Sequence, residues 1–151
     1  MNEMLPQVMI EFCLIGDSID FDAVTATLGL SPTNTRKKES FKYEEFAKDE
    51  WIFSTGYMKS TNISSVFEKL IDVFIGKEDS ICQLISEYDL DCVLIVVIKA
   101  LEGTNPEMIL TQKCIRYVHA INAEIHLDMY LGLGSIRQLS KSTKSDKMCS
   151  R

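Results

Sequence analysis

The sequence lacks the residues and motifs on which most catalytic sites depend. It has only two histidines, and its seven glycines form neither a GxGxxG nor a GxxxxGK[ST] phosphate-binding loop. No GxSxG is present to hold a nucleophilic serine on a strained turn. We therefore expect a protein that is not an enzyme, with no catalytic residues, no metal and no cofactor.

Disulfide, zinc and membrane signals are absent as well. The five cysteines are an odd number and are too widely spaced for a zinc or redox motif. Four of them lie in apolar segments, where a reduced thiol packs as a small hydrophobic group. The N-terminus has no secretory pattern, and the longest apolar run, Val93 to Ile98, falls far short of the roughly 20 residues that span a bilayer. We expect a cytoplasmic protein without membrane contact.

The charge is unevenly distributed along the chain. The net charge is −6, but residues 135–151 contain five basic residues and one acidic residue, a local charge of +4 that leaves −10 for residues 1–134. An acidic body repels the phosphates of nucleic acids and favours basic partners. The same charge can also serve solubility alone, so both interpretations remain open.

Four segments have the apolar patterns of β-strands. Residues 8–15 are apolar on both faces, and residues 51–55 alternate around the only tryptophan. Residues 91–101 are apolar on both faces and rich in β-branched side chains, which predicts a strand in the middle of the sheet. Residues 124–130 alternate strictly, so this strand should have one apolar and one polar face.

Four further segments have helix signals. Asp20 can cap a short helix that Gly29 ends, and residues 62–75 have the clearest amphipathic period in the chain. Asp79 or Ser80 can cap a third helix. A fourth helix follows Thr111, and its predicted buried side consists of Cys114, Ile115, Val118 and Ile121.

These elements predict an α+β fold in a single domain, residues 8–134. We expect one mostly antiparallel or mixed sheet of about five strands with helices packed on one face, and a ferredoxin-like core with additions is the nearest template. Residues 135–151 have almost nothing to bury and are predicted to form a disordered basic tail.

Two clusters of polar side chains are candidate sites. Glu124, His126 and Asp128 share one face of the last strand, and with Glu11 they can serve partner binding, metal binding or proton transfer. A solvated polar face is the simpler interpretation of the same spacing. The basic triplet at 36–38 lies near aromatic residues, as in single-strand nucleic-acid sites, but the acidic residues that follow favour a solvated loop of mixed charge.

The segment IEFCLIGDSIDFDAVTATLGLSPTNTRKKES resembles a bacterial family catalogued as domain of unknown function 4279. Trp51 at the start of a strand, the apolar strand from Val93 to Ile98 and the closing AEIHLDMYLGL support the resemblance, which spans about residues 8–133. The matching pieces imply a common fold and carry no catalytic residues. Some small acidic proteins of such families are suspected of neutralising toxins.

We therefore expect a protein that binds a protein partner of basic charge, in the manner of an immunity or antitoxin-like factor. One alternative is a small-ligand-binding domain or enzyme that uses a pocket under residues 33–50, with Glu11, His126 or Asp128 as its polar groups. Another is a homodimeric scaffold joined through sheet edges, so a monomer and a homodimer are both compatible with the sequence.

Overall fold

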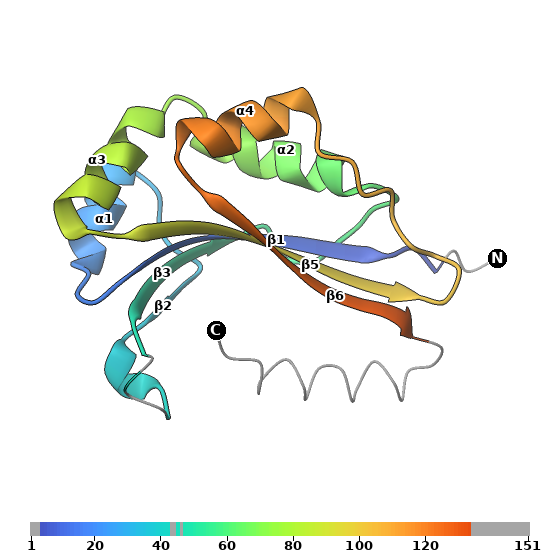
Figure 1. The fold of residues 1–151 in the computed structure, drawn as a ribbon, viewed down its shortest axis with the longest axis horizontal. Coiled ribbons are helices and arrows are strands. Elements are labelled where there is room, and N and C mark those ends of the chain that lie inside the picture. Colours follow the sequence, from blue (N-terminus) through green and yellow to red (C-terminus); the bar gives the residue numbers. More distant parts are fainter. Residues whose placement is uncertain (1–3, 43–44, 46, 134–151) are drawn as a thin grey trace.

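All four helices lie on one face of a single curved β-sheet (Figure 1). The computed structural model describes residues 4–42, 45 and 47–133. Over this part of the chain, no α-helix lies on the opposite face of the sheet, which we call the open face. The predicted fold class, α+β with one mixed sheet and helices on one face, is confirmed.

The elements follow one another with short connections. The strands are β1 (Gln7–Gly16), β2 (Asn34–Arg36), β3 (Asp49–Ser54), β4 (Met58–Lys59), β5 (Asp91–Leu101) and β6 (Glu124–Leu133). The helices are α1 (Phe21–Leu28), α2 (Ile63–Phe74), α3 (Glu78–Tyr88) and α4 (Gln112–Ala120), with a 3₁₀ turn at Lys38–Ser40.

The sheet has the strand order β2-β3-β1-β5-β6, and the short β4 pairs with the start of β1. Every pairing is antiparallel except that of β5 with β6, which are parallel and joined through α4. The strand predicted at the middle of the sheet, β5, is an interior strand, but β1 lies in the middle because β2 and β3 add to its other side. A ferredoxin-like fold separates the parallel strands of each βαβ unit, whereas β5 and β6 are direct neighbours.

Local sequence sets the ends of most helices. Asp20 accepts a hydrogen bond from the Ala23 N–H at 3.1 Å, and Gly29 ends α1 with φ = +66°. The prediction that Asp79 or Ser80 caps α3 is wrong. The Glu78 carboxylate accepts a hydrogen bond from the Gly76 N–H at 3.2 Å, so the turn after α2 leads directly into α3, which begins at Glu78.

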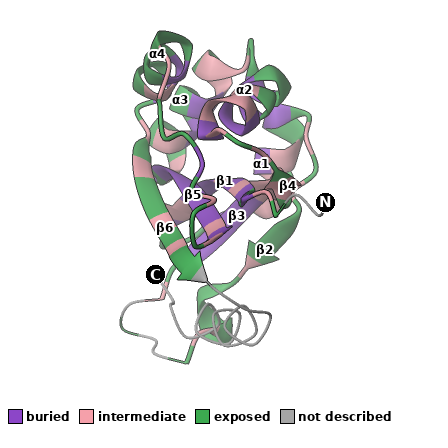
Figure 2. Cartoon of the chain, turned by 90° about the vertical axis from the view of Figure 1, so that its right-hand side faces the viewer, coloured by how far each residue is buried: buried purple, intermediate pink, exposed green. Residues whose placement is uncertain are grey.

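The main core lies between the helices and the sheet, where the buried residues of Figure 2 concentrate. Every second residue of β1 from Val8 to Leu14 is fully buried on this face. Phe12 stacks on Phe74 of α2 at 4.3 Å between ring centroids and meets the edge of Trp51 at 6.2 Å. This core fixes the sheet and therefore the directions of the side chains on the open face.

The cysteine prediction is confirmed for three of the residues that the structure describes. Cys13, Cys92 and Cys114 are buried, and burial raises the pKa of the Cys92 thiol far above its usual range, which keeps it protonated. Cys82 is exposed, contrary to expectation: it is not among the buried residues of α3, and its thiol donates a hydrogen bond to the Ala120 carbonyl of α4 at 3.3 Å.

Across the described ranges, no helix has both the length and the apolar character needed to cross a membrane. The predicted disordered tail, residues 135–151, lies outside the described residues.

Candidate functional site

The four predicted site residues all lie on the open face. Ile95 of β5 stands opposite Glu11 of β1 on one side and opposite His126 of β6 on the other. Residues that stand opposite each other in a sheet point to the same face. Glu124 lies two residues before His126 and Asp128 two residues after it, so they share this face as well.

The register keeps Glu11 apart from the polar residues of β6. Because β5 lies between β1 and β6, their backbones are separated by two strand spacings, roughly 10 Å. Asp128 also belongs to a different row, in which it stands opposite Val97. The structure therefore forms a polar border around an apolar strand and does not bring Glu11 and Asp128 together on adjacent strands.

The polar side chains of β6 interact in pairs along the strand. His126 Nε2 lies 3.0 Å from Glu124 Oε1, and the Tyr130 hydroxyl donates a hydrogen bond to Asp128 Oδ2 at 3.3 Å. Glu124 and His126 are exposed, so their contact contributes little stability. Both carboxylates are instead held in defined positions at the edge of the sheet, within reach of a partner.

A second, smaller apolar cluster forms the centre of the open face. Its buried members come from three strands: Cys13, Ile52, Val93, Ile95 and Val97. Met9, Ile15 and Tyr130 are partly buried and pack against the cluster. The open face thus combines an apolar cluster with polar groups on either side of β5: Glu11 on the central strand β1, and Glu124, His126 and Asp128 on the edge strand β6.

The other face of β6 is apolar and exposed. Leu127 is 55% and Met129 45% exposed, although the alternation predicted that they would lie against the core. The nine-residue helix α4 spans only about 14 Å, whereas the ten-residue strand β6 spans about 33 Å. On the side of β6 that faces the helices, Ile125 therefore packs against the core, and the residues after it extend beyond the part of the sheet that α4 covers.

One residue of α4 was also misplaced by the sequence pattern. Ile115 is exposed rather than buried. The helix turns Cys114, Tyr117 and Ile121 inward, and the Tyr117 hydroxyl donates a buried hydrogen bond of 3.0 Å to the Phe74 carbonyl of α2. This contact fixes the rotation of α4 and leaves Ile115 outside.

Two buried carboxylates escaped the sequence analysis, which placed them in a solvated loop. Asp49 and Glu50 are each only 4% exposed. Asp49 accepts hydrogen bonds from the Ile19 N–H at 3.0 Å and the Lys38 N–H at 2.9 Å, and Arg36 Nε lies 3.4 Å from Glu50. Both residues belong to β3, which begins at Asp49, two residues before the strand that the pattern around Trp51 predicted.

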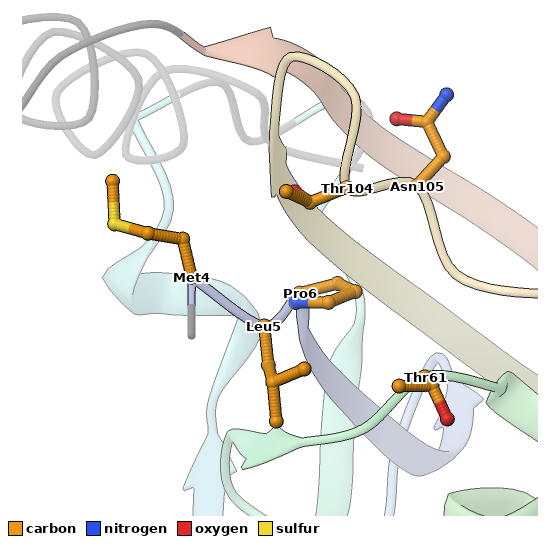
Figure 3. Close-up of a pocket in the computed structure, with 6 residues that line it drawn as sticks. All are labelled: Met4, Leu5, Pro6, Thr61, Thr104 and Asn105. Carbon is orange, nitrogen blue, oxygen red and sulfur yellow. The ribbon is translucent and has the colours of Figure 1, made fainter. Parts of the chain in front are cut away.

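Two hollows lie away from the four predicted residues. One, of about 470 Å³, lies beside the charged loop and is lined by Asp17, Lys38, Glu39, Glu45 and Ala47. The other, of about 310 Å³, has a mostly apolar lining where β1 begins and β5 ends: Met4, Leu5, Pro6, Thr61, Thr104 and Asn105 (Figure 3). Neither of these two hollows contains Glu11, His126 or Asp128.

Within the described part of the chain, no three His, Cys, Asp or Glu residues are grouped so that they can hold a metal ion.

No curated protein matches the sequence, and no solved structure matches it either. Residues 6–132, from the start of β1 to the end of β6, match one protein family. The chain therefore belongs to the family described as Domain of unknown function (DUF4279).

Proposed function

We propose that this protein is a non-catalytic binding protein that binds a basic protein partner through the carboxylates of its open face. The observation that carries the proposal is the placement of Glu11, Glu124 and Asp128 on one sheet face over which no described α-helix lies. An immunity or antitoxin-like role is the concrete form of this proposal, in which binding occludes the functional surface of a basic toxin.

The charge of the chain supports a basic partner. Residues 1–134 carry a net charge of −10, and three of the carboxylates in this part of the chain, those of Glu11, Glu124 and Asp128, lie on one surface. Complementary charge accelerates encounter and excludes partners of the same sign. Screening acts over about 8 Å at physiological ionic strength, so binding should weaken as salt is added.

The neighbouring side chains suit the long basic residues of such a partner. Lys and Arg bring an apolar stem as well as a charged head. The partly buried Met9 and Tyr130 lie at the margin of the apolar cluster, close in register to Asp128. The Nζ of Lys99 already lies 5.9 Å from the centroid of the Tyr130 ring. Met9 is therefore the part of this margin on which a partner's basic side chain can rest its stem while its head reaches a carboxylate.

The compartment is part of the same proposal. Three cysteines are free thiols: Cys82, Cys92 and Cys114. Thiols persist in reducing compartments, whereas secreted proteins generally form disulfides. These cysteines support a cytoplasmic location, in which the protein meets its partner inside the cell.

The proposal is tested by capture with two variants of equal charge. The first changes Glu11 and Glu124 to Gln and Asp128 to Asn on the open face. The matched control changes exposed carboxylates of α1 and α3 in the same way, at Asp22, Asp79 and Glu87. Each variant loses three negative charges, so any difference between them reports where the charges lie rather than how many there are.

The experiment uses the immobilised full chain, a lysate of the native host at low salt, and mass spectrometry of the bound proteins. We expect wild type and the helix variant to retain one basic protein that the open-face variant loses. Elution of that protein by moderate salt supports the electrostatic component. Equal recovery by both variants, or recovery of no partner by wild type, would contradict the proposal.

A further inference from the structure

We infer that two copies of this chain pair through the outer edge of β6, in antiparallel register around Leu127. The outer edge is the side of β6 turned away from β5, over residues 124–131. The inference goes beyond the proposed function, because a monomer can still bind a basic partner through its open face.

The first observation is that β6 forms an accessible end of the sheet. Among the described strands it pairs with β5 alone, so half of its backbone N–H and C=O groups point away from the sheet. Proteins commonly protect such an edge with lysine, proline or a bulge. Residues 124–131 contain neither lysine nor proline, and the register of β6 with β5 becomes irregular only beyond Tyr130.

The second observation is the apolar row on the helix side of this edge. Leu127 and Met129 are about half exposed because α4 is too short to cover them. A two-fold axis perpendicular to the sheet would join two β6 strands antiparallel and keep the helices of both copies on the same side. Centred on Leu127, it places Leu127 against itself and Ile125 against Met129, so apolar side chains meet along the seam.

The third observation is the order of the polar side chains along β6, which favours this register. Residues opposite each other must point to the same face, so the axis has to pass through a residue. With the axis at Leu127, His126 of each copy stands opposite Asp128 of the other. With the axis at His126, Glu124 would stand opposite Asp128. With the axis at Asp128, the Asp128 carboxylates of the two copies would stand opposite each other. An axis at Ile125 would also place His126 opposite a carboxylate, that of Glu124, but it would join only residues 124–126 of β6. Of the longer registers, only that of Leu127 places His126 opposite a carboxylate.

The regular part of β6 matches the length that this register needs. A centre at Leu127 pairs residues 124–130 with the same residues of the second copy, and these residues precede the irregularity. Seven paired residues form roughly six to eight backbone hydrogen bonds. The result is one continuous sheet through both copies, in which the open faces of the two copies lie on the same side.

The test measures the mass of the full chain by light scattering after size exclusion over a micromolar concentration series. Wild type should reach twice the chain mass of 17.1 kDa. Leu127→Lys places two ammonium groups at the axis and should be a monomer. Ile75→Lys adds the same charge at a residue that is 61% exposed after α2, and should remain a dimer. Thermal melts confirm that each variant is folded.

The register is tested by exchanging the charges. His126→Asp places carboxylates opposite each other at two places and should weaken the dimer about tenfold. Adding Asp128→Lys to this variant restores opposite charges in the Leu127 register and should restore the dimer. A monomeric wild type, or a dimeric Leu127→Lys, would overturn the inference. Failure of the double variant to recover would overturn the register. Capture of a basic partner by the monomeric variant tests the proposed function separately.

Discussion

Replacement of Ile95 by aspartate tests the apolar centre of the open face. Ile95 is 3% exposed and lies between Val93 and Val97, with Glu11 and His126 opposite it on the neighbouring strands. Removing a buried isoleucine side chain costs about 2–5 kcal/mol. The new carboxylate must also lose water or take up a proton, at 1.36 kcal/mol for each unit of pKa shift.

We therefore expect Ile95→Asp to lower the free energy of unfolding by 3 kcal/mol or more, about 4 kcal/mol as a central value. Domains of this kind have a total stability of roughly 5–15 kcal/mol, so the loss is large but measurable. Urea denaturation followed by the fluorescence of Trp51 gives the value. The control Ile95→Val removes one methyl group and should cost only about 1 kcal/mol.

The effect should also depend on pH. Burial raises the pKa of the new carboxyl group above its value in the unfolded chain, so the folded state binds its proton more tightly. The stability lost at neutral pH should then be partly regained as pH falls toward about 4. A loss below about 1 kcal/mol at neutral pH, or no difference from Ile95→Val, would refute the assignment of Ile95 to a buried centre.

Two further predictions concern buried polar groups. Asp49→Ala removes the acceptor of the Ile19 and Lys38 N–H groups and should cost about 2–4 kcal/mol in urea denaturation. Asp49→Asn keeps one acceptor oxygen and should cost less, and equal losses would contradict this role. Tyr117→Phe removes the hydrogen bond to α2 and should cost about 1 kcal/mol at neutral pH. Burial raises the pKa of Tyr117, so the stability of the wild type should fall as pH rises above about 10. The stability of Tyr117→Phe should fall less steeply over the same range. Identical pH profiles of the two proteins would contradict this.

Local signals in the sequence were sufficient for most of the elements. Asp20 and Gly29 mark the ends of α1, and Asn122, of a residue type that tolerates positive φ, takes the left-handed conformation after α4. The strand β5 was recognisable because it is apolar on both faces. These features depend on a residue and its near neighbours, so they can be inferred without knowledge of the rest of the fold.

Features that depend on distant parts of the chain were not predictable in the same way. The burial of Asp49 and Glu50 requires the approach of residues 19 and 36–38, which the pattern around Trp51 does not specify. The exposure of Leu127 follows from the length of α4 relative to β6. The strand order places β1 in the middle, and short segments such as β4 carry too few residues to show a period.

The candidate site was predictable in part for the same reason. Alternation alone places Glu124, His126 and Asp128 on one face of their strand. Whether Glu11 shares that face depends on the register of β1 with β5 and of β5 with β6, which is a property of the assembled sheet. The absence of described α-helices from that face is likewise a tertiary feature.

Hydrogen exchange of the full chain, measured with and without the captured partner, tests the central claim most directly. The account predicts that the partner slows exchange of backbone amides in β6 and of those around Glu11 in β1, while α1 and α3 exchange as before. Use of the Leu127→Lys variant separates this protection from any pairing between copies. Protection confined to the helices, with β1 and β6 unchanged, would contradict the open face as the binding surface.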